Sequence, residues 1–375
     1  MTWLHRLYDE LEAEPGSRGV GKGWYSGIFA LVLAAISLAS VVILLFPELF
    51  TTNELRSAVD VSVFRLAVQG ILFCAFVLAV ISLVLREKRV LGLMSIALIL
   101  ISVVLGGSQA TRVTELSGTV YFALDWFILN LLFTGILFLP LERIFYRQPQ
   151  AVFRTEWRED LFYFFISSVM VQILTYLSLA PSLSLLAQVE HASFRGWVDA
   201  QPLLLQVLAI MFLTDFIQYW VHRAFHRIPV LWRFHAVHHS ARTMDWLAGS
   251  RMHFIEIVAL RSITIIPMYV LGFSPTAIYI YLVIVYLSAT YIHANVKWNI
   301  EALKPFVVTP RFHHWHHGIE KEAIDVNFSI HFPLFDRLFG TYYMPKEQWP
   351  SGYGVGGHPV PSGYLKQFLY PFMRR

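Results

Sequence analysis

The sequence has little charge for its length. Of its 375 residues, only 14% are Asp, Glu, Lys or Arg, whereas a soluble domain averages roughly 25%. Hydrophobic residues make up 56% of the chain. Such a chain has too few polar side chains to cover its surface in water, so we expect a membrane protein. The net charge of +4 is no indication of nucleic-acid binding, because the basic residues lie beside apolar runs, where they report membrane orientation.

Long apolar runs are what the sequence has instead. The runs 24–46 and 63–85 each exceed the roughly 20 residues that span a bilayer core, and 90–107 is shorter but sufficient. The first run is too long for a signal peptide, and no small-residue cleavage site precedes a soluble domain. Further candidate spans are 118–140, 160–180, 201–221, 255–272 and 275–292. The sequence therefore predicts an all-α integral membrane protein, folded as a multi-span helical bundle.

Cysteine and several cofactor motifs are also scarce. Cys74 is the only cysteine, which excludes disulfides, iron–sulfur clusters and thiolate zinc sites within one chain. The glycine-rich segment 352–359 lacks the strand-turn-helix context of a dinucleotide site, and no H-E-x-x-H protease motif occurs. No heme motif like that of cytochrome b5 is found either. Electrons for any redox reaction would therefore come from another protein.

Histidine, by contrast, is concentrated. Eleven of the fifteen histidines fall between His222 and His317. "HRAFH" spaces two histidines at i and i+4, while "HAVHH" and "HHWHH" both contain H-x-x-H-H, and such spacings share one face of a helix. The eight residues are His222 and His226; His235, His238 and His239; and His313, His316 and His317. His293 is a plausible ninth nitrogen donor.

This histidine pattern favours metal binding over packing. A lone H-x-x-x-H pair is more often an exposed face or a satisfied core pair, but so many imidazoles together without a metal would bring donors and acceptors into conflict. A catalytic zinc ion needs about three protein ligands, so eight or nine donors fit two metal ions better than one. A dimetal site beside lipid and without thiolates suggests iron and oxygen chemistry rather than hydrolysis.

The distribution of basic residues predicts which side of the membrane the histidines face. The connection 86–89 and the loop 141–159 are rich in arginine and lysine, whereas 47–62, 108–117 and 188–200 are poorer and contain acids. The positive-inside rule then places the N-terminus and the end of the 201–221 span in the cytoplasm. If 255–272 and 275–292 form a hairpin, His293 returns to that face. We expect a cytosolic, histidine-rich, metal-binding cap.

The three histidine boxes, in this order, resemble the fatty acid hydroxylase/sterol desaturase superfamily of membrane di-iron oxygenases. The resemblance covers about 118–345 and is carried by "TDFIQYWVHRAFH" (214–226), "FHAVHHS" (234–240), "TPRFHHWHHG" (309–318) and "DVNFSIHFPLFDRLFGTYY" (325–343). It implies two irons at the cytosolic ends of the spans, O2 as co-substrate, a membrane lipid as substrate, and a ferredoxin-, cytochrome b5- or reductase-like electron donor. The ligands it implies are the eight box histidines, together with His293 in "YIHANVKW".

One departure and three supporting residues follow from the resemblance and the helix spacing. Ala289 stands where some family members have a further histidine. His253 is a candidate replacement for that ligand, and a structural role is the alternative. Asp215 shares a helix face with His222, so we expect it to accept an N–H from an iron-bound imidazole. Glu256, one turn after His253, is a candidate for the same role. His314 is out of register with the other histidines.

The sequence thus divides into an N-terminal membrane region of three spans (1–110), whose role stays open, a catalytic region (118–345), and a tail (346–375) that suits the membrane interface. Hydroxylation of a fatty acyl, sterol-like or ether lipid is the first interpretation, and desaturation or ether cleavage stays open. The competing class is a metal transporter or a heme-bearing electron carrier. A transporter would place its ligands at mid-membrane depth, and a heme needs only two histidines. The oligomeric state is left open.

Overall fold

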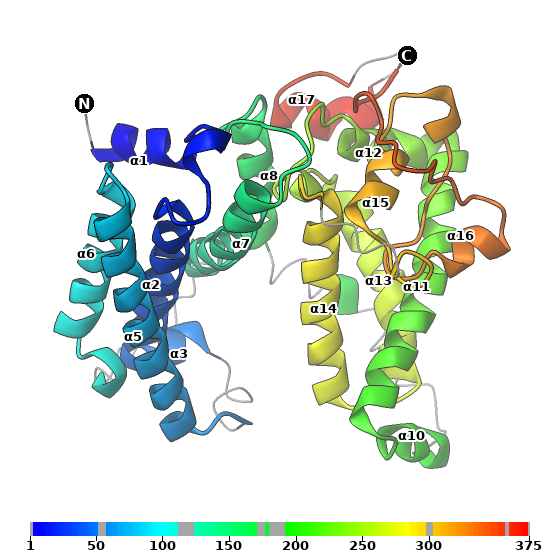
Figure 1. The fold of residues 1–375 in the computed structure, drawn as a ribbon. Coiled ribbons are helices and arrows are strands. Elements are labelled where there is room, and N and C mark those ends of the chain that lie inside the picture. Colours follow the sequence, from blue (N-terminus) through cyan, green and yellow to red (C-terminus); the bar gives the residue numbers. More distant parts are fainter. Residues whose placement is uncertain are drawn as a thin grey trace. The chain divides into compact units, whose positions relative to one another are not determined.

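The computed structural model describes residues 3–51, 58–111, 124–170, 177–179, 192–297, 303–356 and 360–373. Within these ranges the regular structure is helical, and β-pairing is limited to two isolated bridges, Tyr146 with Val296 and Gly318 with Tyr353. The chain forms two compact units (Figure 1). Unit 1 is Met1–Ile144 with Gln150–Val152, and unit 2 is Phe145–Pro149 with Phe153–Arg375. The all-α expectation is confirmed for the described residues.

Unit 1 is built on three long apolar helices: α2 (Trp24–Leu45), α5 (Val61–Leu85) and α6 (Val90–Val104). These helices pack against one another, and the short α1 (Trp3–Leu11) and α3 (Pro47–Phe50) and the longer α7 (Leu124–Ile144) complete the unit. The start of α5 is fixed by Asp60, whose side chain accepts hydrogen bonds from the backbone N–H groups of Ser62 and Val63, as N-cap residues do.

Small residues let the helices of unit 1 approach closely. Ala30 and Ala34 of α2 are buried in one cluster with Ala75 and Ala79 of α5. A Cβ atom added to Gly27 of α2 would lie 2.5 Å from the Ser82 hydroxyl, so no larger residue fits there without movement. This is the packing expected in lipid, where helix association depends on close backbone contact.

Unit 2 contains the histidine boxes. The long helices α11 (Leu203–Arg227) and α14 (Pro275–His293) pack with α13 (Phe254–Val270) around a buried apolar cluster that includes Ile210, Met268 and Ile278. α12 (Pro229–His239) and α15 (Pro310–His316) lie where α11 and α14 end, and α10 (Ala192–Asp199) lies at the opposite end of α11 (Figure 1). The remaining helices of the unit are α8 (Trp157–Val169), α16 (Leu334–Leu338) and α17 (Tyr364–Leu369).

Proline residues set the starts of the histidine-bearing helices. Pro229 begins α12, and because the residue before a proline avoids the helical region, the chain turns at Ile228 between α11 and α12. α15 begins at Pro310, and the hydroxyl of Thr309 accepts a hydrogen bond from the Phe312 N–H. A proline at the first helical position after a Ser or Thr cap is a favoured helix start. The same arrangement, Ser274 before Pro275, begins α14.

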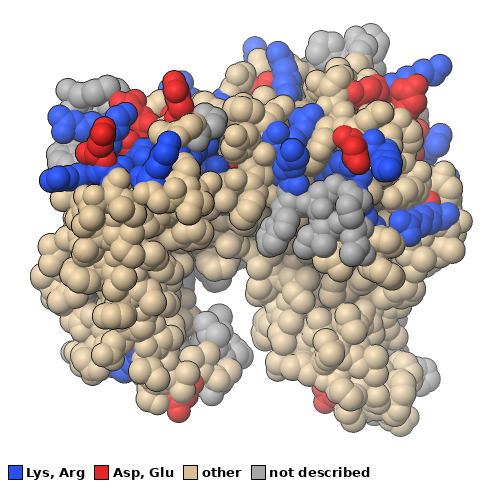
Figure 2. Space-filling view, in the orientation of Figure 1, with Lys and Arg blue, Asp and Glu red and all other residues tan. Residues whose placement is uncertain are grey.

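Five of the described helices are long and apolar enough to cross a membrane: Trp24–Leu45, Val61–Leu85, Val90–Gln109, Leu203–Arg227 and Pro275–His293. They correspond to five of the eight candidate spans. The candidate 255–272 forms α13, which has 17 residues, and 160–180 begins as the 13-residue α8, beyond which 171–176 lie outside the described residues. The candidate 118–140 is described only from Leu124, within α7. In each unit most visible charged side chains gather at one end, and in unit 2 this is the end that carries α12 and α15 (Figure 2).

Candidate metal centre

Four helix ends bring nine histidine rings to one place in unit 2. His222 and His226 lie in the last two turns of α11, and His293 is the last residue of α14. The second box lies in the last turns of α12, while the third occupies α15 and its C-terminal cap residue, His317. All nine rings are buried or nearly so.

The rings form two groups. One contains five histidines and the other four, and within each group the ring nitrogens offered, one per residue, lie within 4.8 Å of one another. We call them the five-histidine group (His222, His226, His235, His239 and His316) and the four-histidine group (His238, His293, His313 and His317). The stacked rings of His239 and His317, with centroids 4.2 Å apart, place the two groups side by side.

Four of the rings are oriented by backbone carbonyl groups. Their Nδ1 atoms lie at hydrogen-bonding distance from a carbonyl oxygen: His222 from Phe328 (2.8 Å), His238 from Arg251 (3.0 Å), His293 from Ala289 (2.7 Å) and His316 from Val326 (2.7 Å). A carbonyl oxygen can only accept, so each of these Nδ1 atoms donates its hydrogen. In the neutral imidazole the Nε2 atom then carries a free lone pair.

Two further rings are oriented by carboxylates. His235 donates from Nδ1 to Oε1 of Glu256, which is only 2% exposed. His226 places its Nδ1 atom 3.4 Å from Oδ1 of Asp325. Glu256, a candidate from the sequence for accepting an imidazole N–H, thus has a box histidine of α12 as its partner. A carboxylate behind an imidazole is the usual arrangement at metal-bound histidines.

The free Nε2 atoms point at one another. Nε2 of His222 lies 3.0 Å from Nε2 of His235, and Nε2 of His293 lies 3.2 Å from that of His238. In both pairs the hydrogen is on Nδ1, so two lone pairs face each other, which is unfavourable unless a cation lies between them. Nε2 of His226 has no hydrogen-bond partner among the described residues.

Protonation does not relieve this conflict. Burial lowers the pKa of the box histidines of α12 and of those at α15 well below the ordinary value of 6.5, because charged imidazolium is poorly solvated there. The rings are therefore neutral at pH 7, which is the form that binds metal ions. The donor set fits two metal ions held by nitrogen.

Asp215 lies elsewhere than expected. Its Oδ1 atom accepts hydrogen bonds from the backbone N–H groups of Ile330 (2.9 Å) and His331 (3.1 Å), and Oδ2 accepts one from Phe332 (2.7 Å). Both oxygens are used by this segment, so the prediction that Asp215 orients an imidazole is wrong. The carboxylate instead ties α11 to the loop before α16.

His253 lies outside both groups. Its Nδ1 atom accepts a hydrogen bond from the Ile255 N–H, so it caps the start of α13, and its Nε2 atom donates to the carbonyl of Phe368. Both ring nitrogens are thus occupied, and the ring stacks on Phe368. The structural role left open for His253 replaces the ligand role, and the four-histidine group receives no fifth donor from it.

His314, which the sequence places out of register with the other histidines, is buried and belongs to neither group. Its Nδ1 atom lies 2.8 Å from the Tyr353 hydroxyl, and its Nε2 atom lies 3.1 Å from the carbonyl oxygen of His293. The ring therefore donates from Nε2 and accepts from Tyr353, which links the segment after α16 to the end of α14.

Sequence reasoning missed the ion pairs behind the four-histidine group. The buried Arg154 pairs with Asp160 and Asp245, and the buried Arg251 pairs with Asp160. Asp245 also accepts hydrogen bonds from the backbone N–H groups of Leu247 and Ala248. These contacts fasten the loop whose Arg251 carbonyl orients His238. Arginine residues in 141–159 were informative for orientation, but their partners are too distant in sequence to be foreseen.

Comparison with known proteins agrees with the box pattern. Residues 207–341 match the family model of the fatty acid hydroxylases. The chain is 31% identical over 186 residues to the ornithine lipid hydroxylase of Rhizobium tropici. This match covers 49% of the chain and 55% of that protein. It is 30% identical over 148 residues to the alkylglycerol monooxygenase of Homo sapiens, a match that covers 39% of the chain and 32% of that protein. It is 26% identical over 228 residues to a putative methylsterol monooxygenase of Dictyostelium discoideum, and this match covers 58% of the chain and 81% of that protein.

The match spans about half the length of the first of these relatives and a third of the second. No solved structure gives a significant match. The matched segment contains every histidine of both groups, and the resemblance of the boxes to this family is confirmed. Residues 207–341 are thus similar to the fatty acid hydroxylases, over the segment that carries both histidine groups.

Proposed function

We propose that the chain is a membrane-bound di-iron oxygenase that hydroxylates a lipid with O2 and electrons from a separate protein. The observation that carries the proposal is the convergence of free Nε2 lone pairs from rings whose Nδ1 hydrogens are already bonded. In this proposal all nine histidines of the two groups are ligands, and 118–345 is the catalytic region. The spans before residue 110 have no assigned chemistry, and 346–375 is proposed as a tail at the membrane interface.

The residues of the chain prepare this site for the reaction. Two iron ions bound there would supply the activation of O2 and the removal of hydrogen from an unactivated C–H bond. The carbonyl of Phe328 and the carboxylate of Glu256 hold the Nδ1 hydrogens of His222 and His235, which fixes the tautomer and direction of both rings. Burial of the rings keeps bulk water away from the nitrogen atoms.

The names of the relatives favour hydroxylation over desaturation. The three proteins compared above are named as a hydroxylase of ornithine lipid and as monooxygenases of alkylglycerol and of methylsterol. All three names describe oxygen insertion into a lipid, so we propose a fatty acyl, sterol-like or ether lipid as the substrate here. Desaturation of a lipid stays the alternative within the superfamily.

We further propose that the centre faces the cytoplasm, where a ferredoxin-, cytochrome b5- or reductase-like donor can reach it. The basic segments at 86–89 and 141–159 support this orientation. A metal transporter would hold its ligands in the middle of spans, whereas His222 and His226 lie in the last two turns of α11 and His293 ends α14. A heme-bearing electron carrier would need two of the nine histidines as axial ligands, so seven rings would have no role.

Metal analysis and lipid profiling test the proposal. Full-length protein from iron-replete cells should contain about two metal ions per chain and no Soret band. With 18O2 and a reducing system, one lipid should gain one 18O atom, and alanine at His238 or His316 should abolish this reaction and lower the metal content. Alanine at His253 is the control and should retain both metals.

Some outcomes would overturn the proposal. A stoichiometric heme, or full activity with a single zinc ion per chain, would refute the di-iron centre. Loss of two hydrogens from the lipid without gain of 18O would identify the desaturase alternative instead.

A further inference from the structure

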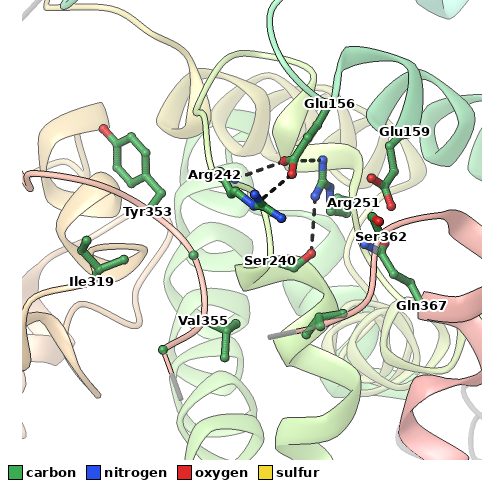
Figure 3. A pocket seen from close by; sticks show the side chains of 13 residues that line it. Glu156, Glu159, Ser240, Arg242, Arg251, Ile319, Tyr353, Val355, Ser362 and Gln367 are labelled. Atoms are coloured by element: carbon green, nitrogen blue, oxygen red, sulfur yellow. Dashed lines mark hydrogen bonds and ion pairs between the residues drawn. The ribbon is translucent and has the colours of Figure 1, made fainter. Parts of the chain in front are cut away.

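A pocket of about 260 Å³ lies in unit 2 between the start of α8, the end of α12 and the segments 353–356 and 360–367 (Figure 3). Two arginines and two glutamates are among its lining residues: Arg242, Arg251, Glu156 and Glu159. Ser240 and Ser362 add hydroxyl groups. Neither the proposed metal centre nor the proposed reaction gives this pocket a role.

The guanidinium groups are only loosely paired inside the pocket. Glu156 lies between them, with its carboxylate oxygens 3.3 Å from Nε of Arg242 and 3.3 Å from Nη2 of Arg251. By comparison, Nε of Arg251 lies 2.5 Å from Oδ1 of Asp160, outside the pocket lining. The Nη1 atom of Arg251 is 3.4 Å from the Ser240 hydroxyl, at the limit of a hydrogen bond. An incoming anion would therefore find donors that the protein satisfies poorly.

The conformation of Glu156 points to a function. Its φ of 69° and ψ of 6° place it in the left-handed region at the N-terminal cap of α8. Side-chain-bearing residues other than Asn and Asp are rare in that region, and such strain tends to occur at binding sites. Here it directs the carboxylate to the two guanidinium groups (Figure 3).

A second glutamate, Glu159, lines the pocket beyond Arg251. It lies close to Ser362 and Gln367 (Figure 3). Its Oε1 atom accepts a hydrogen bond from the Gly363 N–H at 2.7 Å, and no hydrogen bond between its Oε2 atom and a described residue is present. The pocket therefore carries two charges of each sign, with Glu156 between the guanidinium groups and Glu159 beyond Arg251, and this pattern suits a ligand that carries one charge of each sign. A ligand with only one charge would meet repulsion from the like-charged side chains.

The pocket lies one layer of residues from the four-histidine group. The backbone carbonyl of Arg251 orients His238, while Tyr353, another lining residue, pairs with His314 through its hydroxyl. His314 in turn bonds the carbonyl of His293. An occupant of the pocket would thus touch Arg251, whose carbonyl orients the His238 ring.

We propose that this pocket binds the polar head group of the lipid substrate, and that this head group is zwitterionic, with a primary ammonium and an acid group. The acid group binds Arg242, Arg251 and Ser240, and the ammonium binds Glu159. The inference rests on the proposed function and narrows its substrate to lipids of the phosphoethanolamine or amino-acid type.

Binding of soluble head-group analogues to the detergent-solubilised full-length protein tests the charge pattern. By titration calorimetry, glycerophosphoethanolamine or alanine should bind at least tenfold more tightly than glycerol 3-phosphate or ethanolamine, which carry charge of one sign only. The better of the two zwitterions distinguishes phosphate from carboxylate as the acid group. Equal binding of single-charge probes, or no binding of either zwitterion, would overturn the inference.

Three variants test which residue binds the acid group and which binds the ammonium. Arg242→Gln should weaken binding of the zwitterion about tenfold, which is the usual contribution of a charge-assisted hydrogen bond to affinity. Glu159→Gln keeps the oxygen that bonds Gly363 and should abolish the preference for glycerophosphoethanolamine over glycerol 3-phosphate. Lys321→Gln removes an exposed positive charge outside the pocket and should change neither result.

Turnover in nanodiscs separates this inference from the proposed function. With phosphatidylethanolamine or an amino-acid lipid as substrate, Arg242→Gln and Glu159→Gln should raise KM about tenfold while kcat and metal content stay unchanged. If both variants have the wild-type KM and the wild-type protein oxygenates the lipid, the proposal that the pocket binds the head group is refuted, while the proposed function is retained. Selective binding of zwitterions by a protein that holds no metal and oxidises no lipid would refute the function instead.

Discussion

A single methyl group at Gly249 should displace one histidine of the proposed centre. A Cβ atom added there would lie 2.9 Å from Nδ1 and 3.1 Å from Cγ of His293. Ordinary contacts begin at 3.4 Å, so the ring or the loop must move by about half an ångström. The ring cannot turn away freely, because its Nδ1 atom donates to the Ala289 carbonyl at 2.7 Å.

We therefore expect Gly249→Ala to weaken metal binding at the four-histidine group. Loss of a contact that orients a ligand typically costs 10- to 100-fold in metal affinity, and overpacking costs about 1–3 kcal/mol of stability. Elemental analysis of the purified variant should show a fall from about two metal ions per chain toward one. Thermal melting would show whether the fold persists.

Gly196→Ala is the matched control for Gly249→Ala. A Cβ atom at Gly196 meets nothing within 4 Å, and this glycine lies in the helix α10, so alanine there should be neutral or slightly stabilising. The reasoning would be refuted if Gly249→Ala kept two metal ions and wild-type turnover, since the close approach of the loop would then not set the position of the ring.

Four other outcomes follow from the structure. Glu256→Leu removes the acceptor of the His235 Nδ1 hydrogen and should lower metal affinity 10- to 100-fold in a competition titration, whereas Glu256→Gln, which keeps an acceptor oxygen, should lose much less. Asp215→Asn should lower the melting temperature, with a loss of about 1–3 kcal/mol from its backbone hydrogen bonds, while folded protein keeps its metal; loss of metal without loss of stability would contradict this. The pKa values of the buried imidazoles on α12 and α15 lie well below 6.5, so the unfolded chain binds more protons than the folded chain below about pH 6.5. As pH falls further, the free energy of unfolding of the metal-free protein should decrease by about 1.4 kcal/mol per pH unit for each ring. A melting temperature that is constant from pH 7.5 to 5.5 would be inconsistent with neutral buried rings. In a Cys74→Ser background, an impermeant thiol reagent should label Ser193→Cys in intact cells but Lys321→Cys only in opened membranes, and the reverse pattern would place the histidines outside.

The histidine set was predictable because short spacings fix helix faces. Offsets of three and four residues put the rings of one box on one side of a helix, so the eight box residues were identified from local sequence alone. Their division between two groups was not predictable. The neighbours His238 and His239 belong to different groups, as do His316 and His317, because ring direction depends on which helix packs opposite.

The supporting contacts were harder to predict, since their partners lie far away in sequence. Asp215 bonds a segment 115 or more residues later, and its helix spacing with His222 carried no information about that segment. His253 stands just before α13, so its position at a helix start was a local sign of capping. Arg154 contributed to the orientation prediction as a basic loop residue, yet it is buried in ion pairs.

The hydrogen bonds behind the rings also have a consequence for which metal the protein acquires. Because backbone carbonyls and Glu256 already hold the rings in place, little ordering remains to be done when an ion binds. An all-nitrogen cage of this kind does not discriminate by charge or ligand softness, and affinities for such donors rise from ferrous iron toward copper and remain higher for zinc than for iron. For the proposed di-iron centre, iron must therefore be selected by supply rather than by affinity, so we expect the same polypeptide made in zinc-rich medium to be folded, loaded with zinc and inactive.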